Sequence, residues 1–264
     1  MPHAFLDFIV TFIIRREVGV KSVRAIYILI LPHLTNTVWL FRSLRKPSTG
    51  LGPGSGATAA MSDYSRWNRE AATERALAHS EKSSATTDDG KYVYNFAFGS
   101  NLNPDKVKSR KMTPVKVMRG ILPDWRLLFN HVGGYGNIER LDVIQEQQLD
   151  LSRLSWRGLK QPDEVHGVLL KLSRDEFAQM AWEEYAYNTV EVAVQVYPDD
   201  CEKDSRNGEK IVIQHALAFK THPCAVTTSR TLPSSRYIKL IKQGARKSGI
   251  QETYCQWLDS VPSS

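Results

Sequence analysis

An apolar run that stops abruptly constrains this chain more than any other feature. Residues 92–98 read Tyr-Val-Tyr-Asn-Phe-Ala-Phe, and the chain continues with Gly-Ser-Asn at positions 99–101. A run of this composition predicts a buried strand, and Gly-Ser-Asn directly after it predicts a tight turn. The backbone N–H groups of such a turn can face an anionic ligand. An ordinary strand-to-turn junction is the alternative interpretation, because short motifs often arise by chance.

Four blocks in order extend this pattern into a family resemblance. Residues 96–102, Phe-Ala-Phe-Gly-Ser-Asn-Leu, resemble the F-A-Y-G-S-N-L signature of the gamma-glutamylcyclotransferase family. Residues 165–169 resemble its second strand, V-x-G-V followed by a hydrophobic residue. Residues 187–192 resemble its strand that opens with tyrosine, and residues 233–250 resemble its closing loop and helix. The resemblance covers residues 91–260.

The net charge of +7 is concentrated in the first sixty residues. That segment holds seven basic and two acidic residues, a net charge of +5, and the rest of the chain carries +2. Because the remaining chain is nearly neutral, we expect no nucleic-acid partner. The three cysteines, Cys201, Cys224 and Cys255, have neither an even count nor metal-type spacing. They predict reduced thiols in a cytoplasmic protein and no metal site.

Residues 1–46 form an apolar and basic leader that differs from the rest of the chain. Two apolar runs, residues 5–14 and 25–31, flank a basic stretch, and neither reaches the roughly 18 to 20 residues that span a bilayer. The leader fits an organelle-targeting segment or an interfacial anchor with weak membrane contact. It equally fits an extension outside the natural product, since Met61 offers an alternative start.

Residues 47–90 are rich in Ser, Gly, Thr and Ala, which predicts a disordered linker. Within it, residues 63–80 could form a short helix, because their few apolar residues fall near one face. We place the boundary of the folded domain at Lys91, so that the gamma-glutamylcyclotransferase-like domain spans residues 91–264.

For this domain we predict an α+β fold. The resemblance implies a small mixed, barrel-like twisted sheet with flanking helices. We expect strands at residues 92–98, 115–122, 125–130, 164–171, 187–197 and 210–219, and helices at residues 103–111, 173–182 and 235–248. Ser173 has the character of an N-cap, and Gly249 is placed where a helix ends in the left-handed conformation.

The resemblance implies an intramolecular acyl transfer. The α-amine of a γ-glutamyl group attacks its own side-chain amide, which gives 5-oxoproline and releases an amine. A carboxylate within hydrogen-bond reach accepts a proton from the attacking amine and passes it to the leaving nitrogen. Backbone N–H groups of the turn stabilise the oxyanion, and a closed pocket holds the substrate folded. The reaction requires no metal and no cofactor.

An ungapped count from Gly167 places the family's catalytic glutamate on Glu184. Glu183 stays open as the alternative, because the family usually has glycine where this chain has Tyr185, and the loop that follows is short. Adjacent residues of a helix point about 100° apart. One carboxylate can therefore face a pocket while the other faces solvent.

The substrate-binding residues carry over from the resemblance one position at a time. They are Phe98, Gly99, Ser100, Asn101, Leu102, Tyr187 and Tyr237. Phe98 stands where the family commonly has tyrosine, so it brings no hydroxyl group. The link at residues 141–161 is longer than usual, and it would either enlarge the acceptor pocket or form a surface insertion. With the leader, it resembles a fungal branch that acts on glutathione adducts.

Other motifs point to less specific roles. The histidines His131, His166, His215 and His222 show no ligand spacing. Residues 133–136, Gly-Gly-Tyr-Gly, lack the context of a dinucleotide site and indicate a pocket-facing loop or a plain turn. The sequence therefore predicts a gamma-glutamyl cyclotransferase acting on a small γ-glutamyl peptide or a glutathione-type substrate. A non-catalytic module of the same fold that binds a γ-glutamyl or carboxylate ligand is the alternative.

Overall fold

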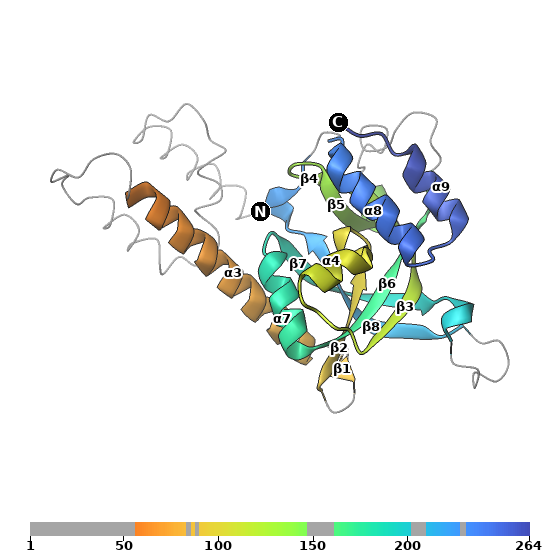
Figure 1. The fold of residues 1–264 in the computed structure, drawn as a ribbon, viewed down its shortest axis with the longest axis horizontal. Coiled ribbons are helices and arrows are strands. Elements are labelled where there is room, and N and C mark those ends of the chain that lie inside the picture. Colours follow the sequence, from red (N-terminus) through yellow and green to blue (C-terminus); the bar gives the residue numbers. More distant parts are fainter. Residues whose placement is uncertain (1–55, 83–85, 88–89, 147–160, 202–209, 228–230) are drawn as a thin grey trace. The chain divides into compact units, whose positions relative to one another are not determined.

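The computed structural model describes residues 56–82, 86–87, 90–146, 161–201, 210–227 and 231–264 (Figure 1). The predicted leader and residues 147–160 of the long link lie outside these ranges. In chain order the elements are α3 (Gly56–Lys82), β1 (Thr86–Thr87), β2 (Tyr92–Ala97), η3 (Ser100–Leu102), α4 (Pro104–Ser109), β3 (Lys116–Pro123), β4 (Trp125–His131), β5 (Tyr135–Arg140), α5 (Leu141–Glu146), β6 (Glu164–Ser173), α7 (Arg174–Glu183), β7 (Tyr187–Val196), η4 (Pro198–Asp200), β8 (Val212–Thr221), η5 (Pro223–Ala225), α8 (Ser235–Lys247) and α9 (Glu252–Ser260).

The main sheet closes on itself. Its strand order is β1-β2-β6-β3-β7-β8, and β2 also pairs with β8. The β2–β8 pairing is parallel, whereas the other pairings in this sheet are antiparallel. Strands β2, β6, β3, β7 and β8 thus form a small barrel, and β4 and β5 form a separate hairpin. This arrangement confirms the predicted α+β fold with a barrel-like sheet.

One glycine of the second sequence block is explained by close packing inside the barrel. Gly167 lies in β6, and a Cβ atom there would stand 2.4 Å from the carbonyl oxygen of Ala97 in the neighbouring β2. Real Cβ contacts are never that short, so a larger residue would push the two strands apart. The strand that carries the pocket turn is thereby held close to its neighbour.

The predicted strands and helices of the domain are all present, with ends shifted by a few residues. Ser173 forms a full capping box with Glu176 at the start of α7, and Gly249 has a φ of 68° after α8. Strand β5 and helices α5 and α9 were not predicted. In β5 a glycine and polar residues interrupt the alternation that predicts a strand. Helix α9 has a buried face at helical spacing, formed by Tyr254, Cys255, Trp257 and Leu258.

Helix α3 (Gly56–Lys82) lies in the segment that was predicted to be a disordered linker. It packs on the domain, so the boundary predicted at Lys91 is too late in the chain. Its side chains Ala72, Ala76 and Ser80 are buried, and Nη1 of Arg69 donates to the Trp182 carbonyl at 3.0 Å. Small residues four apart form a narrow stripe that lets two helices approach closely, although their composition resembles a linker. A chain that started at Lys91 would lose these contacts. No helix in the described ranges combines the length and apolar character needed to cross a membrane.

Candidate active site

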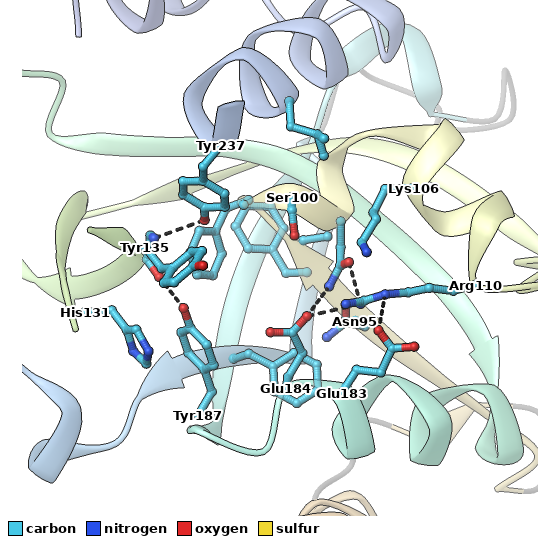
Figure 2. A pocket seen from close by; sticks show the side chains of 18 of the residues that line it. Asn95, Ser100, Lys106, Arg110, His131, Tyr135, Glu183, Glu184, Tyr187 and Tyr237 are labelled. Atoms are coloured by element: carbon cyan, nitrogen blue, oxygen red, sulfur yellow. Dashed lines mark hydrogen bonds and ion pairs between the residues drawn. The ribbon is translucent and has the colours of Figure 1, made fainter. Parts of the chain in front are cut away.

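A cavity of about 560 Å³ collects most of the residues that the sequence singled out. One side of the cavity is lined by the end of β2, the turn η3 and the end of α7 (Figure 2). The β4–β5 hairpin, β7 and α8 line the rest. The predicted residues in the lining are Phe98, Gly99, Ser100, Asn101, Glu184, Tyr187 and Tyr237. Glu183, the alternative to Glu184, also lines the cavity. Among the lining residues that the site prediction did not include are Asn95, Lys106, Arg110, His131, Tyr135, Gly136 and Arg236.

The turn after β2 is held by its own hydrogen bonds. The Leu102 N–H donates to the Gly99 carbonyl at 3.0 Å, and the Asn103 N–H donates to the Ser100 carbonyl at 3.2 Å. Within the described residues, the N–H groups of Ser100 and Asn101 have no acceptor. Both remain available to an anion. Leu102 is buried, is not among the residues that line the cavity, and its N–H donates to Gly99. It therefore supports the turn, in place of the predicted contact with substrate.

Gly99 is required by close approach and not by a left-handed backbone. Its φ is −101°, which other residues also adopt. A Cβ atom at Gly99 would stand 3.2 Å from the Tyr237 hydroxyl. This distance is shorter than most real Cβ contacts, so a side chain at this position would crowd the Tyr237 hydroxyl and force it to shift.

A charged cluster joins the turn to the end of helix α7 (Figure 2). Oε1 of Glu184 accepts hydrogen bonds from Nδ2 of Asn101 at 3.2 Å and from Nη1 of Arg110 at 3.1 Å. The same Arg110 nitrogen donates to Oδ1 of Asn101 at 2.7 Å. Nε of Arg110 lies 2.8 Å from a carboxylate oxygen of Glu183. Arg110 therefore fixes the orientation of both carboxylates and of the turn.

The period of helix α7 separates the two glutamates. Phe177, Met180 and Ala181 face the core, and residues three, four and seven positions apart share one face of a helix. Glu184 follows on that inward face, whereas Glu183 is rotated about 100° from it. Both glutamates line the cavity. The exposed fractions agree, at 17% for the Glu184 side chain and 36% for that of Glu183. The geometry favours Glu184 as the residue that reaches a bound ligand.

Two tyrosines contact the backbone of one glycine, Gly136, on the opposite wall. The Gly136 N–H donates to the Tyr237 hydroxyl oxygen at 3.0 Å, and the Tyr187 hydroxyl donates to the Gly136 carbonyl at 3.2 Å. Burial raises the pKa of both hydroxyls above the ordinary tyrosine value. Both therefore stay protonated at neutral pH, and the hydrogen of the Tyr237 hydroxyl is free to point at a ligand.

His131 extends this wall. Its ring stacks on Tyr187, with centroids 4.6 Å apart and planes 6° from parallel. Burial lowers the pKa of His131, so the ring is neutral at neutral pH. The sequence analysis gave His131 no role in the site, and only the fold brings it to the cavity.

Two further residues of the site, Gly136 and Arg110, differ in how clearly the sequence indicated them. Gly136 belongs to the glycine-rich stretch that the sequence analysis placed in a loop or turn, and the structure puts its peptide at the cavity. Arg110 had no sequence signal, because it lies just after a short helix and outside the four family blocks.

Among known proteins, the chain is similar to several solved structures. No protein-family model matches the chain, and a search of curated proteins gives no match. One similar solved structure is named gamma-glutamyl cyclotransferase, with 19% identity and a TM-score of 0.46 over 66% of this chain and 90% of that chain. An uncharacterized protein from Homo sapiens has 19% identity and a TM-score of 0.45, over 66% and 90% of the two chains.

A third similar structure is a yeast cyclotransferase described as specific to glutathione. It has 11% identity and a TM-score of 0.37, over 65% of this chain and 96% of that chain.

Proposed function

We propose that this protein is a gamma-glutamyl cyclotransferase. The observation that carries the proposal is the carboxylate of Glu184, which lies in the cavity wall and is held by Asn101 of the predicted binding turn. Asn101 belongs to the first sequence block, and Glu184 is the residue that the second block indicates. Their hydrogen bond joins two separate sequence indications in a single site.

The reaction can be followed through the residues of the cavity. Glu184 accepts a proton from the α-ammonium of the bound γ-glutamyl group, which frees the nitrogen lone pair. This nitrogen attacks the γ-amide carbon and forms the new C–N bond of the five-membered ring. The tetrahedral intermediate then collapses, and the bond to the leaving nitrogen breaks as Glu184 returns its proton to that nitrogen. Glu184 next takes the second proton from the ring nitrogen and passes it to the released amine. The products are 5-oxoproline and an amine that leaves as its ammonium ion.

The remaining polar groups of the cavity suit the charges that develop in this reaction. The N–H groups of Ser100 and Asn101 and the hydroxyl of Tyr237 are donors for the oxyanion or for the substrate carboxylate. Arg110 keeps the Glu184 carboxylate in place while its proton moves. The cavity volume of about 560 Å³ is in the range of small-molecule sites. We infer a small γ-glutamyl peptide or a glutathione-type molecule as substrate.

One assay tests the proposal. The purified full chain is incubated with glutathione, γ-glutamyl-alanine and a glutathione S-conjugate, and released 5-oxoproline is measured. We expect catalytic release from at least one of the three. Tight binding of 5-oxoproline in calorimetry without release from any substrate would instead support the non-catalytic binding module.

A further inference from the structure

A buried asparagine in the wall of the cavity has one polar side-chain atom without a hydrogen-bond partner among the described residues. Asn95 lies in β2, is 1% exposed, and lines the cavity (Figure 2). Its Nδ2 donates to the Leu217 carbonyl of the neighbouring strand β8 at 2.9 Å. Its Oδ1 is buried and has no donor in the part of the chain that the structure describes.

The identity of the free atom follows from its partner. The oxygen and nitrogen of an asparagine amide are told apart by the groups around them. The Leu217 carbonyl can only accept, so the NH₂ group must face β8. The atom without a partner is therefore the carbonyl oxygen, which needs a donor.

An unused acceptor at this position destabilises the free protein. Buried polar groups nearly always have hydrogen-bond partners, and each exception requires an explanation. Three nearby residues of β2, Val93, Phe96 and Ala97, are buried and apolar. A leucine would suit such surroundings better than an amide with one free end. A ligand that supplies the donor explains why the chain has asparagine here.

We propose that Oδ1 of Asn95 binds the α-amino group of the γ-glutamyl substrate; this inference rests on the proposed function. A γ-glutamyl peptide offers only two kinds of donor near its reacting atoms, the α-ammonium and the N–H of the scissile amide. Its carboxylate and carbonyl oxygens are acceptors, which Oδ1 would repel. Glu184 lines the same cavity, and an ammonium group has three hydrogens to share between two acceptors.

This contact also orients the nucleophile. After Glu184 has taken one proton, the amine keeps two N–H bonds and one lone pair. A hydrogen bond to Asn95 fixes the direction of one N–H bond, which restricts where the lone pair points. Asn95 thereby acts as a binding and orienting residue and moves no proton itself.

Two ligands that differ only at the α-position test the proposal. Glutaryl-alanine keeps the amide N–H of γ-glutamyl-alanine but lacks the α-amine, so it cannot cyclise. The KM and kcat for γ-glutamyl-alanine and the inhibition constant of glutaryl-alanine are measured for wild type, Asn95→Leu and Asn95→Asp. If wild type shows no turnover, the proposed function fails, and calorimetric Kd values for the two ligands still test Asn95 separately.

In Asn95→Leu we expect γ-glutamyl-alanine to bind about tenfold or more weakly, because a hydrogen bond to a charged group is lost. Glutaryl-alanine should change by less than about threefold. Asn95→Asp retains an oxygen acceptor toward the ligand and should keep the preference for the ligand with the amine. Its second oxygen replaces the NH₂ group that donates to the Leu217 carbonyl, so this variant should be less stable than wild type. Equal weakening of both ligands, or no change in either, would overturn the proposal. If Asn95→Leu does not fold, Asn95→Ala repeats the test with a side chain that cannot overpack.

Discussion

Two polar clusters of this protein are built from similar parts and serve different ends. The first, here the pocket cluster, is Asn101, Arg110, Glu183 and Glu184. The second, here the Arg119 cluster, is Arg119, Glu164, His166, Tyr197 and Asp200. In both clusters an arginine pairs with carboxylates at hydrogen-bond distance. None of the residues of the Arg119 cluster lines the cavity.

The Arg119 cluster is occupied by its own partners. The Arg119 guanidinium binds both carboxylate oxygens of Asp200, at 2.9 and 2.7 Å, and the Gly249 carbonyl at 3.2 Å. His166 contacts Glu164 at 2.8 Å through one ring nitrogen and the Tyr197 hydroxyl through the other. The same Tyr197 hydroxyl accepts a hydrogen bond from the N–H of Gln251, the N-cap of α9, at 3.3 Å. The cluster therefore ties the start of α9 to the barrel, beside α8 (Figure 1).

The Arg119 cluster contains shifted pKa values although it does not line the cavity. The hydrogen bond from Arg119 lowers the pKa of Asp200, and burial lowers the pKa of His166 against the opposing effect of Glu164. Both shifts occur in residues that do not line the cavity. A charged group that lies beside a cavity, with donors and acceptors left unused, identifies the functional cluster better than a shifted pKa does.

The largest effect should come from the proton acceptor of the pocket cluster. Glu184→Gln keeps the shape of the side chain and removes its basicity, so kcat should fall by a factor of about 100 or more. The melting temperature should stay close to that of wild type. Glu183→Gln is the matched control and should be mild. If the two effects on kcat are exchanged, the catalytic assignment belongs to Glu183.

A second, smaller effect concerns the turn. Gly99→Val would crowd the Tyr237 hydroxyl, so we expect binding of 5-oxoproline to weaken by roughly 30-fold or more, with a parallel loss of turnover. Ser100→Ala should stay within about threefold, because only its backbone N–H is assigned a role. Calorimetric titration with 5-oxoproline measures both. Unaltered binding in Gly99→Val would contradict the placement of the ligand at the turn.

The Arg119 cluster should respond in the opposite way. Asp200→Asn breaks a two-point contact with Arg119, so the free energy of unfolding should fall by about 1–3 kcal/mol, while kcat of the folded protein is retained. Denaturant unfolding and the 5-oxoproline assay give the two values. A large loss of kcat at full stability would mean that this cluster takes part in function after all.

The smallest effect is a dependence of stability on pH. Because the pKa of His166 in the folded protein is below the ordinary value of 6.5, the unfolded chain binds a proton first as the pH falls. Stability should therefore decrease as the pH drops below about 6.5. His166→Gln should reduce this slope. His131 and His222 contribute slopes of the same sign, since burial lowers their pKa values too.

Asp200 acts in a separate, more acidic range. Its pKa in the folded protein is below the ordinary value of 3.8, so its contribution to stability is lost only as the pH falls below that value. Unfolding curves between pH 7 and pH 3 would resolve the two ranges. An unchanged slope near pH 6 in His166→Gln would show that the histidine is not held neutral by burial.

Local sequence was enough to predict six strands and three helices of the domain, but not β5, α5 or α9. The apolar run before Gly99, the N-cap at Ser173 and the left-handed Gly249 are signals that act within a few residues. Helix α3 was missed as part of the fold because its stripe of alanines stabilises nothing until α7 is present to pack against it. Its composition therefore resembled a linker.

The sequence by itself determined which residues of the family blocks are candidates for the site, among them Asn101, Glu184 and Tyr237. The count from Gly167 favoured Glu184 but left Glu183 open, because the sequence does not show which face of α7 the core buries. Only the tertiary structure brought Arg110, Gly136 and Asn95 to the same cavity. Their roles arise from partners 51 to 122 positions away in the chain, and no local pattern encodes contacts of that separation.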